Sequence, residues 1–205
     1  TKAQLGGVIG TAAALGAAIY AGPVKKTQEF EAQMSSVKSI IASSYGDSPA
    51  GLKELEKDMG RLNAIAKQMG ATTKFTATES GQALQYMAMA GWKADQMIAG
   101  LPGIMNLAAA SGEDLGQVSD IVTDALTAFG MKAEEAGHFA DVLAVASSNA
   151  NTDVAMMGAT LQQGAPVAGA LGYSVEDMSL GIGLMANASI KAEVAGTSLK
   201  TALSN

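Results

Sequence analysis

The sequence of 205 residues contains no cysteine, a single histidine and only 4% aromatic residues. The absence of cysteine excludes disulfide bonds, thiol catalysis and cysteine-based metal sites. The one histidine, His138, could build a metal site only with carboxylates such as Glu134 and Asp141, and both acids have simpler uses near a helix start. The chain also lacks the G-x-S-x-G and P-loop motifs. We therefore expect no enzyme activity, no metal site and no cofactor.

Basic residues are scarce in the second part of the chain. Residues 1–93 contain ten Lys and Arg against seven Asp and Glu, a net charge of +3, whereas residues 94–205 contain three against twelve, a net charge of −9. Nucleic-acid binding needs clustered basic side chains that displace counterions, so we expect no specific nucleic-acid partner. The uneven charge indicates either ordinary solvated helix faces or two ends that contact different partners.

Apolar residues recur at helical spacing along most of the chain, and no stretch alternates with the period of two that a half-buried strand requires. Glycine (24 residues) and methionine (12 residues) are frequent, which suits helices that cross closely. Capping boxes at Thr76 and Ser174 predict helix starts. We predict an all-α protein, with shorter helices near residues 77–90, 94–111 (with a break near Pro102), 113–129, 133–149, 152–171, 174–188 and 192–203.

The longest charge-free apolar segment near the N-terminus runs from Leu5 to Val24, between Lys2 and the pair Lys25 and Lys26. Twenty helical residues could span a bilayer, but most of these are Ala or Gly, which favour insertion weakly. Larger side chains recur in steps of three and four residues, as in a helix that packs in an oligomer. These positions are Leu5, Val8, Ala12, Leu15 and Ile19. Packing and membrane insertion both stay open on the sequence alone.

Two amphipathic helices are predicted after Pro23, which interrupts or kinks the preceding helix. The second helix covers residues 52–69, after a turn at residues 45–51. The first presents an apolar seam, and we expect this seam and the one at residues 5–19 to join copies of the chain into a trimer or hexamer. The seam of the first helix consists of Phe30, Met34, Val37 and Ile41.

These patterns predict three parts. Residues 1–45 form a long helix with a kink, residues 46–70 form a second amphipathic helix, and residues 71–205 form a compact bundle of shorter helices. The chain begins without Met and ends in the helical pattern "SLKTALSN". We therefore expect it to be an excerpt of a longer polypeptide.

Three short segments share one pattern: "AGWKADQM" at residues 90–97, "FGMKAEEA" at 129–136 and "LGYSVEDM" at 171–178. In each, Gly precedes a large apolar residue, and acidic residues open the next segment. Glycine can take the left-handed conformation that ends a helix, and the next residue can fold back onto the last turn. We predict hinges between packed helices. The hinge residues are Gly91, Trp92, Gly130, Met131, Gly172 and Tyr173.

Five phrases in order resemble the core region of phage tail tape measure proteins, over nearly all of residues 20–203. They are "PVKKTQEFEAQMSSVKSI" (23–40), "LNAIAKQMGATTKFTATESGQALQYMAMAGW" (62–92), "LPGIMNLAAASGEDLGQVSDIVTDALTAFGM" (101–131), "DVLAVASSNANTDVAMMGATLQQGAPVAGALGYSVEDM" (141–178) and "AGTSLKTAL" (195–203). The resemblance implies a structural protein in the lumen or tip of the tail of a phage or tail-like bacteriocin. Such a protein helps to set tail length and is released at DNA ejection.

The resemblance also implies partners: the tail tube protein, tail tip or hub proteins, assembly chaperones and further copies of the chain, with assembly in the host cytoplasm. One helix of this length would reach only about 300 Å, and glycine hinges shorten it, so we expect a module attached to the ruler. The rival role is a membrane-active ejection protein, in which residues 5–24 form a channel in the host inner membrane.

Overall fold

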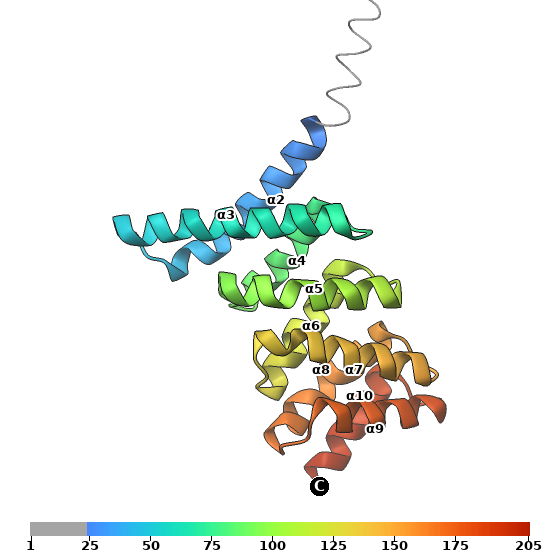
Figure 1. Ribbon diagram of the computed structural model, residues 1–205. Helices are drawn as coiled ribbons and strands as arrows, with labels where there is room; N and C mark the ends of the chain where they lie inside the picture. Colours follow the sequence, from blue (N-terminus) through green and yellow to red (C-terminus); the bar gives the residue numbers. More distant parts are fainter. Residues whose placement is uncertain (1–23) are drawn as a thin grey trace, which may run out of the picture.

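Residues 24–205, which the computed structural model describes, form helices and no strand, and this confirms the all-α prediction. The two amphipathic helices are α2 and α3, and the shorter helices follow from α4 onward (Figure 1). The bounds are α2 Lys25–Ile41, η2 Ala42–Ser44, α3 Pro49–Thr72, α4 Ala77–Met89, α5 Ala94–Ser111, α6 Leu115–Phe129, η3 Ala133–Glu135, α7 Ala136–Asn149, α8 Val154–Ala170, α9 Val175–Asn187 and α10 Ala192–Ser204.

Alternate helices pack on one another in two layers. Helices α2, α4, α6, α8 and α10 form one layer, and α3, α5, α7 and α9 form the other (Figure 1). Four helices of the first layer, α4, α6, α8 and α10, begin at residues 77, 115, 154 and 192. A helical hairpin therefore recurs at nearly constant spacing along the sequence. This arrangement is that of an α-solenoid, in which each repeat contacts chiefly its neighbours. The stacking itself was not among the expectations from the sequence.

Side-chain caps fix where the shorter helices begin. Thr76 accepts a hydrogen bond from the backbone N–H of Glu79 at 3.1 Å, and the Glu79 carboxylate accepts one from the backbone N–H of Thr76. Ser174 and Asp177 form the same reciprocal pair at the start of α9. Both predicted capping boxes are therefore present, and such caps each contribute about 1 kcal/mol.

The break that we expected near Pro102 is not observed. Helix α5 is continuous from Ala94 to Ser111, with Pro102 inside it. Leu101 and Ile104 are fully buried on either side of the proline. Their burial in the core keeps the helix continuous although Pro102 cannot donate a backbone hydrogen bond.

The predicted seam of α2 is buried inside the chain. Its four side chains are at most 7% exposed and belong to the main hydrophobic core. They lie on α2, which packs against α4. These side chains are therefore not available to a second copy, and the oligomer interface that we expected here is wrong, because it assumed that the helix stands alone. The four residues are Phe30, Met34, Val37 and Ile41.

The other predicted seam and the kink at Pro23 lie outside the described residues. The same holds for the candidate membrane segment from Leu5, except for Val24 at its end, which is exposed. Among the helices of residues 24–205, none combines the length and the apolar character that a membrane span requires.

Candidate functional site

The three repeated glycines lie in the turns that connect α4 to α5, α6 to α7 and α8 to α9. Gly91, Gly130 and Gly172 have positive φ angles of 80°, 66° and 82°. The backbone N–H of each following residue donates to a carbonyl five residues before it, as from Trp92 to Met87 at 3.0 Å. The same bonds run from Met131 to Leu126 at 2.9 Å and from Tyr173 to Ala168 at 3.0 Å. This is the Schellman pattern that ends helices.

The side chains after these glycines differ in their surroundings. Trp92 is 8% exposed, and its indole lies against Gly100 of α5, where an added Cβ would be 2.5 Å from the ring. Tyr173 is 46% exposed, and Met131 is half-buried. Trp92 therefore packs on the helix that follows its turn, whereas Tyr173 stays accessible.

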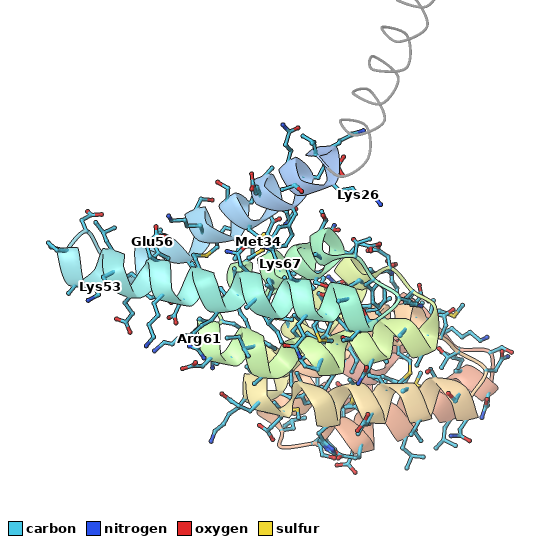
Figure 2. The ribbon with its side chains drawn as sticks, turned by 45° about the horizontal axis from the view of Figure 1, so that its top comes forward. Lys26, Met34, Lys53, Glu56, Arg61 and Lys67 are labelled. Atoms are coloured by element: carbon cyan, nitrogen blue, oxygen red, sulfur yellow. The ribbon has the colours of Figure 1, made fainter. Side chains whose placement is uncertain are left out.

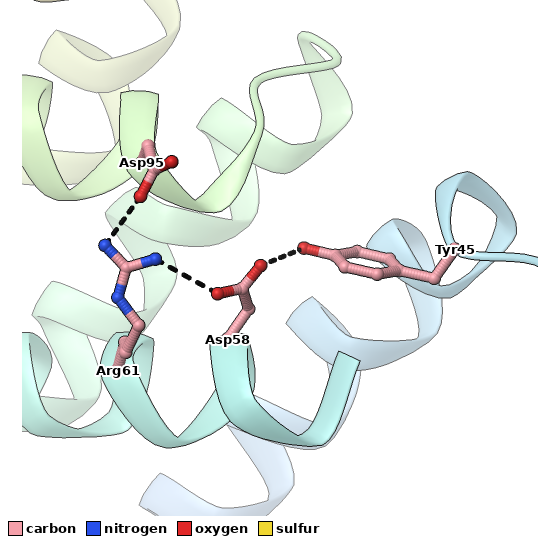
Figure 3. A network of polar contacts seen from close by, with 4 residues as sticks. All are labelled: Tyr45, Asp58, Arg61 and Asp95. Atoms are coloured by element: carbon pink, nitrogen blue, oxygen red, sulfur yellow. Dashed lines mark hydrogen bonds and ion pairs between the residues drawn. The ribbon is translucent and has the colours of Figure 1, made fainter. Parts of the chain in front are cut away.

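A polar network joins the first helices to the repeats (Figure 3). Tyr45, just after η2, donates its hydroxyl to Asp58 of α3 at 2.8 Å. Arg61 of α3 donates to Asp58 at 3.0 Å and to Asp95 of α5 at 2.6 Å. The pKa of Arg61 is raised, first by the hydrogen bonds to Asp95 and Asp58. Through these bonds the network fixes the segment after η2 and helix α3 against α5.

Burial and the neighbouring Asp58 raise the pKa of Tyr45 from 10.0 to about 12. A raised pKa contributes stability that is fully present below the unfolded value and is lost as pH rises through the folded value. We therefore expect this contribution to disappear between about pH 10 and pH 12. In an ultraviolet titration of tyrosinate, Tyr45 should ionise late, and Tyr45→Phe should remove that late step. A Tyr173→Phe variant that removed it instead would contradict the assignment.

A groove of about 630 Å³ lies between α7 and α9. Its walls are apolar, and three large side chains on them are well exposed: Val145 at 62%, Leu180 at 66% and Leu184 at 63%. Large apolar side chains that cluster on a surface mark contact sites more often than scattered ones do. We call this feature the α7/α9 groove.

Both ends of the α7/α9 groove are polar. At one end, His138 Nε2 lies 2.7 Å from Glu176 Oε1, and Asp141 lines the groove beside them. The pKa of Glu176 is lowered, first by a hydrogen bond from its own backbone N–H and further by His138. At the other end, Asn187 accepts a hydrogen bond from the backbone of Asn151 at 2.8 Å.

His138 was considered above as a metal ligand with Glu134 and Asp141. Its partner in the structure is instead Glu176, which lies on the next helix of the same layer. Within residues 24–205, no group of three or more His, Asp or Glu side chains is arranged to hold a metal ion.

The floor of the α7/α9 groove contains a buried hydroxyl group. Ser179 is 3% exposed, lines the groove and has no hydrogen-bond partner for its Oγ. Leaving such a group unpaired costs about 1–3 kcal/mol. A ligand that enters the groove could therefore gain from a polar group that reaches this hydroxyl.

The repeats differ at the helix crossing where the groove lies. Between α5 and α7, Gly103 meets Gly137, and an added Cβ on Gly103 would be 2.6 Å from the Gly137 Cα. When the repeated glycine turns are placed in register, Val142 of α7 corresponds to Gly103, and Ser179 of α9 corresponds to Gly137. Both line the groove. Val142 is larger than the Gly103 to which it corresponds, so it cannot approach the facing helix as closely as Gly103 does. The groove could not be predicted from either helix alone, since it depends on a pair of positions.

The described part of the chain is thus a stack of helical repeats with a surface groove, and no group of its His, Asp or Glu side chains is arranged to hold a metal ion. A family model for phage-related minor tail proteins matches residues 63–205, and the chain belongs to this family of tail proteins. This confirms the resemblance that was noted from the sequence.

Two relatives have related names. The chain is 37% identical over 184 residues to the tape measure protein of Pneumococcus phage Dp-1, and 26% identical over 176 residues to the probable tape measure protein of Escherichia phage P2. These matches cover 90% and 86% of this chain but only 15% and 20% of the two relatives. The chain thus spans a fifth or less of their length. No solved structure matches it.

Proposed function

We propose that this chain is a compact module of a tape measure protein, which lies in the tail tube or tip and helps to set tail length and to direct assembly. The whole protein would be released when the DNA is ejected. The observation that carries the proposal is the 37% identity over 90% of the chain to a protein named as a tape measure protein.

The fold supports a module rather than the ruler itself. A ruler needs length, and one straight helix rises about 1.5 Å per residue. Here the chain reverses direction after each described helix, and the helices stack on their neighbours. The described residues therefore form a compact stack rather than an extended rod. We propose that an elongated part of the same protein sets the length, while this stack supplies contact surfaces.

The proposed partners are the tail tube protein, tail tip or hub proteins, assembly chaperones and other copies of the chain. The uneven charge supports different partners at the two ends. Helix α3 presents Lys53 and Lys67 (Figure 2), and Lys67 lies 5.3 Å from the Phe30 ring. Residues 94–205, by contrast, have a net charge of −9.

Deleting one helical hairpin in the phage tests the proposal. If the segment 115–153 were part of an extended helical ruler, removing it would shorten the tail by about 60 Å. We expect a much smaller change in tail length, measured by electron microscopy, and fewer complete tails. Shortening by the full helical length of the deleted segment would show that the stack is part of the ruler. Normal tails after deletion of residues 63–205 would contradict a role in assembly.

The second candidate function is a membrane-active ejection protein. The observation that favours it is the uncharged stretch at residues 5–24, which is long enough to span a bilayer. Flotation of the purified chain with liposomes, with and without residues 1–24, distinguishes the two roles. Flotation that requires these residues favours the membrane role.

A further inference from the structure

We infer that the α7/α9 groove binds the apolar segment at residues 5–24 of a second copy of this chain. The inference deepens the proposed self-association and rests on that part of the proposed function. It starts from the exposed side chains of Val145, Leu180 and Leu184, which line an open apolar surface. The α7/α9 groove would thus be the binding site for the apolar seam predicted at residues 5–19, which lies outside the described residues.

The size of the groove suits this occupant. The groove follows α7 from His138 to Asn149, which is about 16 Å along the helix. In the apolar segment, Leu15 and Ile19 are four residues apart, and the residues between them are Ala or Gly. At helical spacing, two large side chains would enter the groove while small neighbours allow close approach.

The charges are complementary. Asp141 and Glu176 lie at one end of the groove, and the apolar segment is followed directly by Lys25 and Lys26. Lys25 is exposed, and its described ion pair is a long one with Glu29, at 3.8 Å. An acidic rim beside an apolar groove thus matches an apolar stretch with a basic end.

The partner is a second copy because of the position of the segment. It joins the chain at α2, which lies at one end of the stack, whereas α7 and α9 lie toward the other end (Figure 1). A contact between unlike surfaces of two copies is heterologous, and repeated contacts of this kind close into a ring or extend as a filament. The copies would therefore join head to tail in one of these two arrangements.

The test uses the 205-residue chain in sedimentation velocity over a range of concentrations. We expect reversible association that a synthetic peptide of residues 1–26 inhibits by competing for the groove. Leu184→Asp should weaken association at least tenfold. The matched control is Met89→Asp, since Met89 of α4 is similarly exposed, at 57%, but lies outside the groove. Circular dichroism verifies that both variants are folded.

Three outcomes would overturn the inference. The first is association of the Leu184→Asp variant at parental strength, which would place the contact elsewhere. The second is equal weakening by Met89→Asp, which would indicate non-specific apolar contact. The third is that the peptide of residues 1–26 binds vesicles but does not inhibit association of the protein. All are measured on purified protein, so the groove contact can fail while the tail-length experiment succeeds, and the reverse also holds.

Discussion

Gly103→Ala is expected to lower the free energy of unfolding by about 2–3 kcal/mol, because the added methyl group overpacks the contact between two helices. The added Cβ would be 2.6 Å from the Cα and 2.9 Å from the N of Gly137. Those atoms belong to the backbone of α7, so no side chain can rotate away, and α5 and α7 must separate. Urea unfolding followed by circular dichroism measures the change.

Gly137 provides the matched control across the same contact. An added Cβ on Gly137 meets nothing within 4 Å. Gly137→Ala should therefore show only the better helix propensity of alanine and raise the free energy of unfolding by about 0.5–1 kcal/mol. Gly60→Ala in α3 should do the same, since its Cβ position is also open. If Gly103→Ala and Gly137→Ala changed stability in the same direction, the close crossing would be contradicted.

Replacing Gly91, Gly130 or Gly172 by valine is expected to cost about 1–2 kcal/mol at each site. All three have positive φ, and an added Cβ would meet nothing within 4 Å. The cost is therefore conformational rather than steric. Asparagine visits this conformation more readily than valine, so Gly→Asn should be tolerated better. Thermal melts of the paired variants measure the difference.

Alanine at His138 provides the comparison for these melts. The pair of His138 and Glu176 is exposed, and exposed ion pairs contribute little, so His138→Ala should leave the melting temperature close to that of the parent. The same is expected for Glu134→Ala and Asp141→Ala, since both side chains are exposed. If the valine variants melted like the parent while His138→Ala abolished function in a folded protein, the turns would be unimportant and a site would have been missed.

The helices were predictable because their signals are local. Apolar spacing of three and four residues, the caps at Thr76 and Ser174 and the glycine turns act within one or two helical turns. Observed helices such as Ala77–Met89 and Ala192–Ser204 differ from the expected ranges by one residue at one end. The layered stack depends on contacts between segments that lie a whole repeat apart in the sequence, and spacing within a helix does not encode such contacts.

The sites were less predictable for the same reason. The α2 seam was recognised as apolar, but periodicity does not say whether the partner is α4 of the same chain or another copy. Tyr45, Asp58 and Asp95 belong to three separate parts of the chain, and Arg61 links the two aspartates. The α7/α9 groove lies at a crossing where Val142 and Ser179 occupy the positions of two glycines in the preceding repeat. A comparison of the repeats in register, rather than a search for motifs, could have indicated it.

The stacking of nearest neighbours also determines how the protein would respond to force. Because each hairpin is supported chiefly by the hairpins beside it, a pull on one end loads one interface at a time. The hairpins would then unfold one after another. The force required would depend on the weakest interface between two hairpins rather than on the whole core. A protein stored in this compact form can be drawn out as a thin thread, and it would pass through a channel that is too narrow for the folded stack.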